Sequence, residues 1–419
     1  MRANASKEIL WDAVVIGGGP AGMMAAGRAA ENGRRVLLLE KNPSLGKKLL
    51  ITGGGRCNVT NHRTDVRAML AKYKQGGRFL HSAFSQFGVS EALDFFHKHG
   101  MPTKVEAEGR VFPASNIAQS VLDVLAEYMK ATGVQVKTNA AVSGIVREEK
   151  TGVLTLRLKD KQEILAASCI VATGGVSHPE TGSTGEGFLW LKKLGHTIIN
   201  NDVALVPVAL SDGWAKKLGG VTLKDIKLTV FQNHKKEGIH KGKLLFTHFG
   251  VSGPTVLNMS KEIGEFLQYG EVVIVLDLFP SLDHGVLKSQ LQALLAEESN
   301  KKLKNILGKL IPSSLAPPVL ALAGIDGETP AHSVRREDRV KLVALMKEIP
   351  LHVKGLLGAE KAVVSSGGVA LDEVDFKTMQ SRLVPNLYLI GDVLNIDRPS
   401  GGYSLQLCWT TGFVAGSSV

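Results

Sequence analysis

The chain opens with two apolar runs separated by a glycine-rich stretch. Residues 12–16 have the length and composition of a buried strand, and from Ala21 onward small and apolar residues recur at helical spacing. A second apolar run, residues 36–39, follows this helix. The order strand, helix, strand predicts a parallel βαβ unit at the start of an α/β fold.

The same strand pattern returns in two later places. Residues 170–172 form an apolar strand that ends in small residues, and residues 387–390 form another, followed by helical spacing from Tyr403 to Val414. An ordinary amphipathic terminal helix, with no role at a ligand site, also explains the spacing from Tyr403 to Val414. Because these runs belong to one parallel sheet, we expect a discontinuous domain, three-layered and Rossmann-like, over residues 1–195 and 365–419.

The pattern changes after Gly195. Residues 203–280 alternate apolar and polar positions, as antiparallel strands do, whereas residues 283–348 have helical periodicity punctuated by Pro312, Pro317 and Pro318. The clearest expected strands are residues 223–231, 242–246 and 272–278. Residues 361–371 are strand-like and lead back to the first domain. We therefore expect an inserted β-rich domain over residues 196–280 and 349–364, with a helical subdomain over residues 281–348.

Composition narrows the class of protein. The chain has 419 residues, 46 of them glycine, and only 5% aromatic residues, a balance typical of a soluble α/β protein. No apolar stretch is long enough for a membrane span, and the N-terminus leads into the first strand without a signal peptide pattern, so we expect a cytoplasmic protein. The three cysteines are isolated, which argues against a disulfide framework and against a redox dithiol.

The formal net charge is +11, and much of it is local. Residues 213–243 hold eight lysines and two acidic residues, with almost no arginine or aromatic residue between them. A solvated, lysine-rich strand surface explains this segment better than nucleic-acid binding, because lysine also discourages edge-to-edge pairing of strands. The chain has no paired Cys/His cluster and no acidic cation loop, so no metal site is indicated.

The glycine-rich stretch has the residues that a dinucleotide needs. Gly17 permits a tight turn, Gly19 lets the backbone approach a diphosphate, and Gly22 lets the helix pack closely on the strand. The free N–H groups at the helix N-terminus favour phosphate oxygens. Glu40 ends the second strand, where a carboxylate accepts hydrogen bonds from a ribose. Either NAD or FAD satisfies this pattern.

Further motifs favour a flavin. "GGGPAG", "ITGGGRCNVTN", "ATGG", "TGSTGEGF", "LFTHFGVSGP" and "LIGDVLNIDRPSGGYSLQ" together resemble the bacterial BaiN-like family of NAD(FAD)-utilizing dehydrogenases, over nearly the whole chain. The resemblance implies an FAD-binding domain interrupted by a β-barrel-like unit and a small helical unit. The residues that it implies for the cofactor are Gly17, Gly19, Pro20, Ala21, Gly22, Glu40, Lys41, Arg56, Cys57, Asn58, Val142, Thr173, Gly174, Gly391, Asp392, Gly401, Gly402, Tyr403 and Ser404.

Three positions depart from that family pattern. The family more often has Glu at position 392, Asn at 404 and Asp at 186, where this chain has Asp392, Ser404 and Glu186. In the family pattern Asp392 faces the ribityl and diphosphate region, and residues 401–404 approach the isoalloxazine ring. The shorter Asp392 is therefore expected to alter a ribityl contact.

We expect an FAD-dependent oxidoreductase in which hydride passes at flavin N5 between a nicotinamide donor, NADH or NADPH, and a small organic substrate. Two alternatives stay open: an NAD-linked dehydrogenase without flavin, and a flavin-containing nucleic-acid-binding or sensor protein. No catalytic residue is assigned. His248 is more simply a structural hydrogen-bonding residue, and Cys57 is better explained by packing near the cofactor than as a nucleophile.

Overall fold

The chain forms two compact units. The computed structural model describes residues 10–199, 203–358, 364–365 and 367–419. Contacts divide it into a first unit, Met1–Val203 with Ala362–Val419, and a second unit, Ala204–Lys361. The first unit is thus assembled from both ends of the sequence.

A seven-stranded sheet forms the centre of the first unit, in the order β6-β2-β1-β9-β8-β7 with β20 also paired to β9. Its strands are β1 (Leu10–Ile16), β2 (Val36–Leu39), β6 (Gln135–Lys137), β7 (Val142–Arg147), β8 (Leu154–Leu158), β9 (Glu163–Val171) and β20 (Leu387–Leu389). Strands β6, β2, β1, β9 and β20 run parallel, and β8 pairs antiparallel with both β7 and β9. The expected Rossmann-type parallel sheet is confirmed. Because β1, β2, β9 and β20 are parallel, their carboxyl ends lie at one edge of the sheet.

Helices α1 (Pro20–Glu31) and α14 (Tyr403–Ser418) pack against each other at unusually short distance. A Cβ atom added to Gly412 would lie 2.6 Å from the carbonyl oxygen of Ala21, and one added to Gly416 would lie 2.5 Å from that of Ala25. The two helix backbones therefore touch where glycine provides the space.

Helix α14 is buried on nearly all sides, so the interpretation as an ordinary amphipathic helix is wrong. Its polar residues Gln406, Thr410 and Thr411 have no exposed surface. The amide of Gln406 donates to the carbonyl of Gly88 at 2.9 Å, and the Thr410 hydroxyl donates to that of Phe87 at 2.8 Å. These hydrogen bonds compensate the burial of the polar side chains and allow a central helix.

The remaining elements of the first unit surround this core. They are the helices α2 (Lys47–Ile51), α3 (Val66–Leu70), α4 (Gly76–Gln86), α5 (Val89–Lys98), α6 (Ala118–Ala131) and α7 (Glu186–Lys193), and the strands β3 (Thr60–Asn61), β4 (Thr103–Val105), β5 (Arg110–Pro113), β10 (Ile198–Ile199), β11 (Val203–Ala204), β18 (Val364–Ser365) and β19 (Gly368–Val369). Strands β3, β5 and β4 form a small antiparallel sheet. Of the strand expected over residues 361–371, positions 361–363 and 366 lie outside the described residues, and the described part forms β18 and β19.

The second unit contains a closed antiparallel barrel in the order β12-β15-β14-β13-β16-β17. Its strands are β12 (Val208–Leu210), β13 (Thr222–Gln232), β14 (Lys235–Thr247), β15 (Gly250–Ser252), β16 (Val272–Asp277) and β17 (Ile349–Leu356). The three antiparallel strands expected from the sequence correspond to β13, part of β14, and β16. The short helix α8 (Gly213–Lys216) precedes β13.

A helix that the sequence pattern did not predict, α9 (Pro254–Leu267), lies inside the expected β-rich segment. Val256, Met259 and Ile263 recur at helical spacing and are fully buried in the core of the second unit. The helical spacing of these three residues indicates α9 in the sequence. The alternating pattern of the strands on both sides of the segment obscured this indication.

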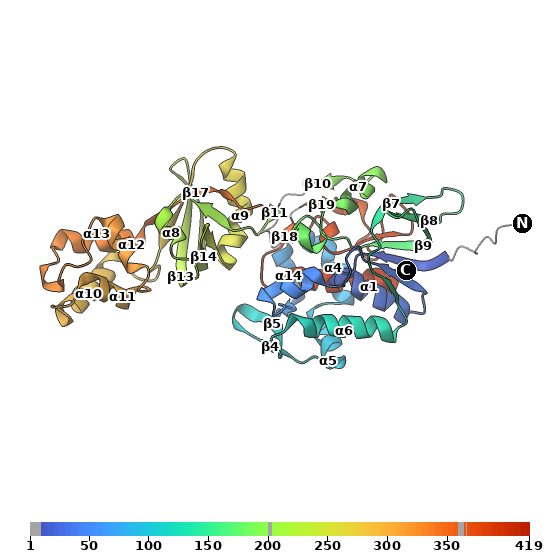
Figure 1. Ribbon diagram of the computed structural model, residues 1–419, viewed down its shortest axis with the longest axis horizontal. Coiled ribbons are helices and arrows are strands. Elements are labelled where there is room, and N and C mark those ends of the chain that lie inside the picture. Colours follow the sequence, from blue (N-terminus) through green and yellow to red (C-terminus); the bar gives the residue numbers. More distant parts are fainter. Residues whose placement is uncertain (1–9, 200–202, 359–363, 366) are drawn as a thin grey trace, which may run out of the picture. The chain divides into compact units, whose positions relative to one another are not determined.

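Four helices lie together beside the barrel (Figure 1) and share its hydrophobic core. They are α10 (His284–Glu297), α11 (Leu303–Leu310), α12 (Ala316–Ala323) and α13 (Arg336–Lys347). An ion pair between Lys347 and Asp277, at 2.9 Å, connects α13 to the end of β16. Among the residues that the structure describes, no helix is both long and apolar enough to cross a bilayer.

Candidate functional site

The carboxyl edge of the parallel sheet gathers four of the predicted segments. The N–H of Gly17, after β1, donates to the carbonyl of Leu39 at the end of β2, at 2.8 Å. Ala172, after β9, donates to Ile16 at 2.9 Å, and Ile390, after β20, donates to Val171 at 3.2 Å. The glycine loop, Glu40, Thr173 and Asp392 therefore lie along one edge, although the chain separates the first from the last by more than 370 residues.

The glycines of the loop have different physical roles. Gly17 has a φ of +111°, and a Cβ there would lie 2.5 Å from the carbonyl oxygen of Ala172. A Cβ on Gly22 would lie 1.9 Å from the carbonyl oxygen of Gly17, so the helix needs glycine in order to pack. At Gly19, by contrast, an added Cβ meets no atom within 4 Å. Gly19 thus borders open space directly before Pro20, where α1 begins.

Both oxygens of the Glu40 carboxylate are held in place. The N–H of Gly18 donates to Oε2 at 2.8 Å, and the backbone and side-chain nitrogens of Asn42 donate to Oε1, each at 2.8 Å. The side chain is buried, with 8% of the residue exposed. Since each carboxylate oxygen has two lone pairs, Glu40 keeps the capacity to accept a further hydroxyl group.

Lys41 and Val142 lie at the β2 end of the edge. Lys41 Nζ donates to the Thr184 hydroxyl at 2.8 Å and pairs with Glu186 at 3.0 Å; Glu186 also pairs with Lys159 at 2.9 Å. Burial raises the pKa of Glu186, but these two lysines outweigh burial and hold the pKa below its usual value. Val142 begins β7, two residues after Ala140, whose N–H donates to the Glu40 carbonyl at 2.9 Å.

Thr173 and Gly174 pack against the glycine-rich segment 182–187. A Cβ on Gly187 would lie 2.2 Å from the Thr173 hydroxyl oxygen, and one on Gly174 would lie 2.8 Å from the Ser183 hydroxyl oxygen. The segment therefore supports the end of β9 by close packing.

Arg56, Cys57 and Asn58 follow the short helix α2. The Arg56 guanidinium lies 4.0 Å above the Phe112 ring and donates to the Asn116 side chain at 2.7 Å. Cys57 is fully buried, and burial raises the pKa of its thiol to about 12, with a smaller opposing effect of the Thr52 hydrogen bond. This thiol is protonated at neutral pH, which agrees with a packing role.

The C-terminal segment contributes Gly391 and Asp392. Gly391 has a φ of +63°, and a Cβ there would lie 3.1 Å from the Ala21 Cβ in the first turn of α1. Asp392 forms an ion pair with Arg398, whose Nε donates to the Ser404 hydroxyl at 3.1 Å. Arg398 thus contacts both Asp392 and Ser404, two of the three residues at which the chain departs from the family pattern.

Gly401, Gly402 and Tyr403 pack against β3 at the start of α14. A Cβ on Gly402, with φ +98°, would lie 2.3 Å from the carbonyl carbon of Thr60. The Asn61 side-chain nitrogen donates to the Gly401 carbonyl at 3.1 Å, and Arg63 donates to the Tyr403 hydroxyl at 3.0 Å. Every predicted cofactor residue therefore belongs to the first unit.

The residues fit an elongated dinucleotide such as FAD. The side-chain oxygens of Asn58 and Asn61 are buried without a hydrogen-bond partner, which is costly unless a ligand supplies one. Added Cβ atoms on Gly54 and Gly55 meet no atom within 4 Å, as at Gly19. Buried polar atoms that lack a partner are a feature of a ligand site.

The sequence analysis missed Lys48, Arg398 and Asn61 as functional candidates, although Asn61 and Arg398 lie inside the motifs that carry the family resemblance. Their significance depends on partners far along the chain, such as Ser177 for Lys48, at 3.1 Å, and Gly401 for Asn61. His248, in the turn between β14 and β15, is exposed and belongs to the second unit.

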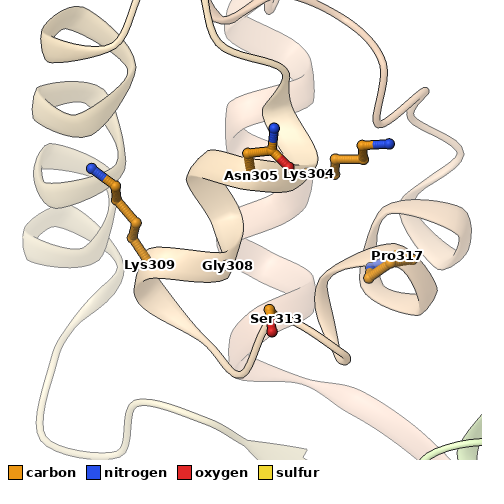
Figure 2. Close-up of a pocket in the computed structure, with 6 residues that line it drawn as sticks. All are labelled: Lys304, Asn305, Gly308, Lys309, Ser313 and Pro317. Atoms are coloured by element: carbon orange, nitrogen blue, oxygen red, sulfur yellow. The ribbon is translucent and has the colours of Figure 1, made fainter.

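A pocket of about 270 Å³ lies in the second unit between α11 and α12 (Figure 2). Its lining residues are Lys304, Asn305, Gly308, Lys309, Ser313 and Pro317. The two lysine side chains extend away from each other (Figure 2), and they form ion pairs with Glu328 and Glu298. None of the predicted cofactor residues lines this pocket.

Comparison with known proteins agrees with this geometry. The family described as "HI0933-like protein Rossmann domain" matches residues 11–418. A 3-dehydro-bile acid delta(4,6)-reductase of Clostridium scindens is 30% identical over 405 residues, covering 96% of this chain and 97% of the relative. A ribosomal RNA dihydrouridine synthase of Escherichia coli is 30% identical over 406 residues, covering 96% of each chain.

Solved structures share the fold at low sequence identity. A flavocytochrome c3 fumarate reductase matches with a TM-score of 0.54 and 16% identity, over 99% of this chain and 78% of that chain. A 3-ketosteroid-delta4-(5alpha)-dehydrogenase of Rhodococcus jostii matches with a TM-score of 0.54 and 15% identity, over 99% of this chain and 98% of that chain.

Proposed function

The chain belongs to the HI0933-like family, and we propose that it is an FAD-dependent reductase that saturates a carbon–carbon double bond conjugated to a carbonyl group. The observation that carries this proposal is the match, over 96% of the chain, to two relatives whose names describe reductions. Oxidoreductase activity and FAD follow from the family and from the fold of the first unit. The double bond and the electron donor are our proposals.

The two names have one chemistry in common. In the first, delta(4,6) denotes ring double bonds and 3-dehydro denotes a ketone conjugated with them; in the second, dihydrouridine is uridine with two added hydrogens. In both, two electrons and two protons convert a double bond to a single bond beside a carbonyl. A site that serves either substrate needs a hydride source and a proton donor.

When bound, FAD would supply the two-electron chemistry, namely hydride transfer from a reduced nicotinamide, NADH or NADPH, to the β-carbon of the substrate, with a proton added at the α-carbon. The chain's residues bind and orient the group. The glycine loop and the N-terminus of α1 would hold the diphosphate, and Glu40 would accept a hydrogen bond from the adenosine ribose. The N-terminus of α14, at Gly402, would direct the positive end of a helix dipole toward the flavin and so stabilise the negative charge of its reduced form.

Spectroscopy tests the proposal directly. The purified protein should be yellow, and anaerobic NADH or NADPH should bleach it. A 3-oxo-Δ4 steroid or a uridine-containing RNA should then restore the oxidised spectrum with formation of the saturated product. A colourless protein that cannot be reconstituted with FAD would falsify the assignment and favour an NAD-linked dehydrogenase.

An RNA-borne uridine is the second candidate substrate class, supported by the E. coli relative and by the basic hairpin β13–β14. Lys227 and Lys241 are paired directly across the two strands, an arrangement that repels. Lys227 has Asp277 as a partner at 3.0 Å, whereas Lys241 has no carboxylate within 4 Å among the described residues. A phosphate backbone relieves such repulsion.

Salt dependence separates RNA from a small substrate. Binding of ribosomal RNA fragments should weaken steeply between about 50 and 200 mM salt if several lysines contact phosphates. Replacing Lys224 and Lys241 by glutamine should weaken RNA binding and leave reduction of a steroid enone unchanged. RNA binding that is independent of salt and of both lysines would contradict this candidate.

A further inference from the structure

Lys48 crosses the carboxyl edge of the sheet. It is the second residue of α2, in the connection after β2, and its ammonium donates to the hydroxyl of Ser177 at 3.1 Å. Ser177 is fully buried and follows β9. The Lys48 side chain thus links the loop after β2 to the loop after β9, and among the described residues it has this one hydrogen-bond acceptor for three N–H donors.

The charge of Lys48 is not neutralised by a carboxylate. Other cations at this edge have one: Lys41 pairs with Glu186, and Arg398 pairs with Asp392. Within the described residues, no carboxylate oxygen lies within 4 Å of the Lys48 ammonium. Burial lowers the pKa of Lys48, and the nearby charge of Asp392 opposes this effect. A partly buried cation with unused donors is costly unless an anion completes its surroundings.

Helix α2 begins beside the glycine loop. The N–H of Gly46, which precedes α2, donates to the carbonyl of Gly18 at 2.9 Å, and a Cβ on Gly18 would lie 2.4 Å from the Leu45 side chain. The loop itself offers only N–H groups and a helix dipole to a ligand. Glu40, at the same place, adds negative charge, so a doubly charged diphosphate needs a cation from another segment.

We propose that Lys48 is the residue that neutralises the diphosphate of the bound dinucleotide. The proposal rests on the proposed function only in taking FAD as the ligand. The adjacent Lys47 provides an internal comparison, because it has the same charge on the same helix but donates to the side-chain oxygen of Asn42 at 3.3 Å, on the Glu40 side.

Binding titrations of the flavin-free protein test the proposal. Lys48→Met should weaken FAD and ADP binding about 10- to 100-fold, as expected for loss of a charge-assisted hydrogen bond, and Lys48→Arg should retain most of the affinity. Lys47→Met should change either affinity less than about threefold. Riboflavin, which has no diphosphate, should bind wild-type protein and Lys48→Met equally. Thermal unfolding of each flavin-free variant establishes that it is folded, and Lys48→Gln, which also removes the charge, replaces Lys48→Met if the latter is not.

The pH dependence gives a second readout. As the pH rises from 7.5 to 10, wild-type affinity for FAD should fall because Lys48 loses its proton, whereas that of Lys48→Met should stay level. The other groups near the ammonium are Asp392, Glu180, Arg398 and Cys408. Burial raises the pKa of the Cys408 thiol to about 12, so this thiol keeps its proton over the range tested.

Each outcome decides between the proposals. Equal losses in Lys47→Met and Lys48→Met, or an equal loss for riboflavin, would overturn the role of Lys48. Tight FAD binding that depends on Lys48, without reduction of any enone, would overturn the proposed function and support the role of Lys48. A folded wild-type protein that binds neither FAD nor ADP would overturn both.

Discussion

Arg398 and Asp392 form an ion pair at the carboxyl edge of the sheet, with 1% and 16% of their side chains exposed. The guanidinium also donates to the carbonyl of Ile396 at 2.7 Å and to the hydroxyl of Ser404. The pair therefore connects the end of β20 to the start of α14. Arg398 pairs with one carboxylate oxygen of Asp392. We expect the other oxygen to make the proposed contact with the ribityl chain.

Asp392→Asn should lower the free energy of unfolding of the flavin-free protein by about 3 kcal/mol, because it leaves the Arg398 charge buried without a partner. Urea unfolding measures the change. Arg398→Met in the Asp392→Asn background should recover most of the loss. Asp372→Asn, at an exposed carboxylate, is the control, and equal stability of Asp392→Asn and Asp372→Asn would contradict the role of the pair.

Gly22→Ala and Gly19→Ala should separate folding from binding. The added methyl group at position 22 meets the Gly17 carbonyl oxygen at 1.9 Å, so we expect a loss of about 2–3 kcal/mol or more in unfolding free energy. At position 19 the methyl group enters open space, so the flavin-free melting temperature should hardly change while FAD affinity falls. Melting curves with flavin titrations give both quantities, and a folded Gly22→Ala protein of normal stability would contradict the packing argument.

The three thiols should be unreactive in the native protein. Cys57, Cys169 and Cys408 are buried, and burial raises the pKa of each thiol. At pH 8, iodoacetamide followed by mass spectrometry should label none of them within the time that labels all three in urea. Rapid native labelling at Cys57 would revive a nucleophilic role for this residue.

Glu373 should stabilise the fold in a pH-dependent way. It accepts from His196 at 2.8 Å, and the other nitrogen of His196 lies 2.9 Å from the Ser381 hydroxyl. Burial raises the pKa of Glu373, but hydrogen bonds from Thr197 and His196 outweigh burial and leave it below the usual value. Its stabilisation is thus present above the unfolded pKa, about 4.3, and is lost as pH falls through the lower folded pKa.

Glu373→Gln should therefore cost about 1–2 kcal/mol at pH 7, and the difference from wild type should shrink below about pH 4. Urea unfolding at several pH values measures this. Glu328→Gln is the matched control, since Glu328 pairs with Lys302 and Lys304 on the surface and should contribute little. A stability difference that stays constant from pH 7 to pH 3 would contradict the assignment to the Glu373 carboxylate.

The sequence was sufficient for the elements whose pattern is local. The strand that ends at Gly17 and the glycine spacing after it depend on neighbouring residues, and the structure has them as expected. The return of the C-terminal strand to the sheet was also predictable, because residues 387–390 form a short apolar run like those of the other strands predicted for the parallel sheet.

Other features depend on contacts that no local pattern records. Helix α14 has polar side chains that are buried only because distant carbonyls accept from them, so its polarity suggested an exposed face. Lys48 and Ser177 lie 129 positions apart, and neither residue type indicates the other. Pairing of this kind requires the folded sheet edge, which brings the loops after β2 and β9 together.

The backbone contact between α1 and α14 has a consequence for synthesis. Strand β20 and helix α14 follow the second unit in the sequence, so a nascent chain on the ribosome cannot complete the central sheet or cover α1 until both elements have been synthesised. The intervening unit, Ala204–Lys361, emerges earlier and has its own hydrophobic core. Completion of the first unit therefore requires β20 and α14 to join elements that were synthesised before the whole of the second unit.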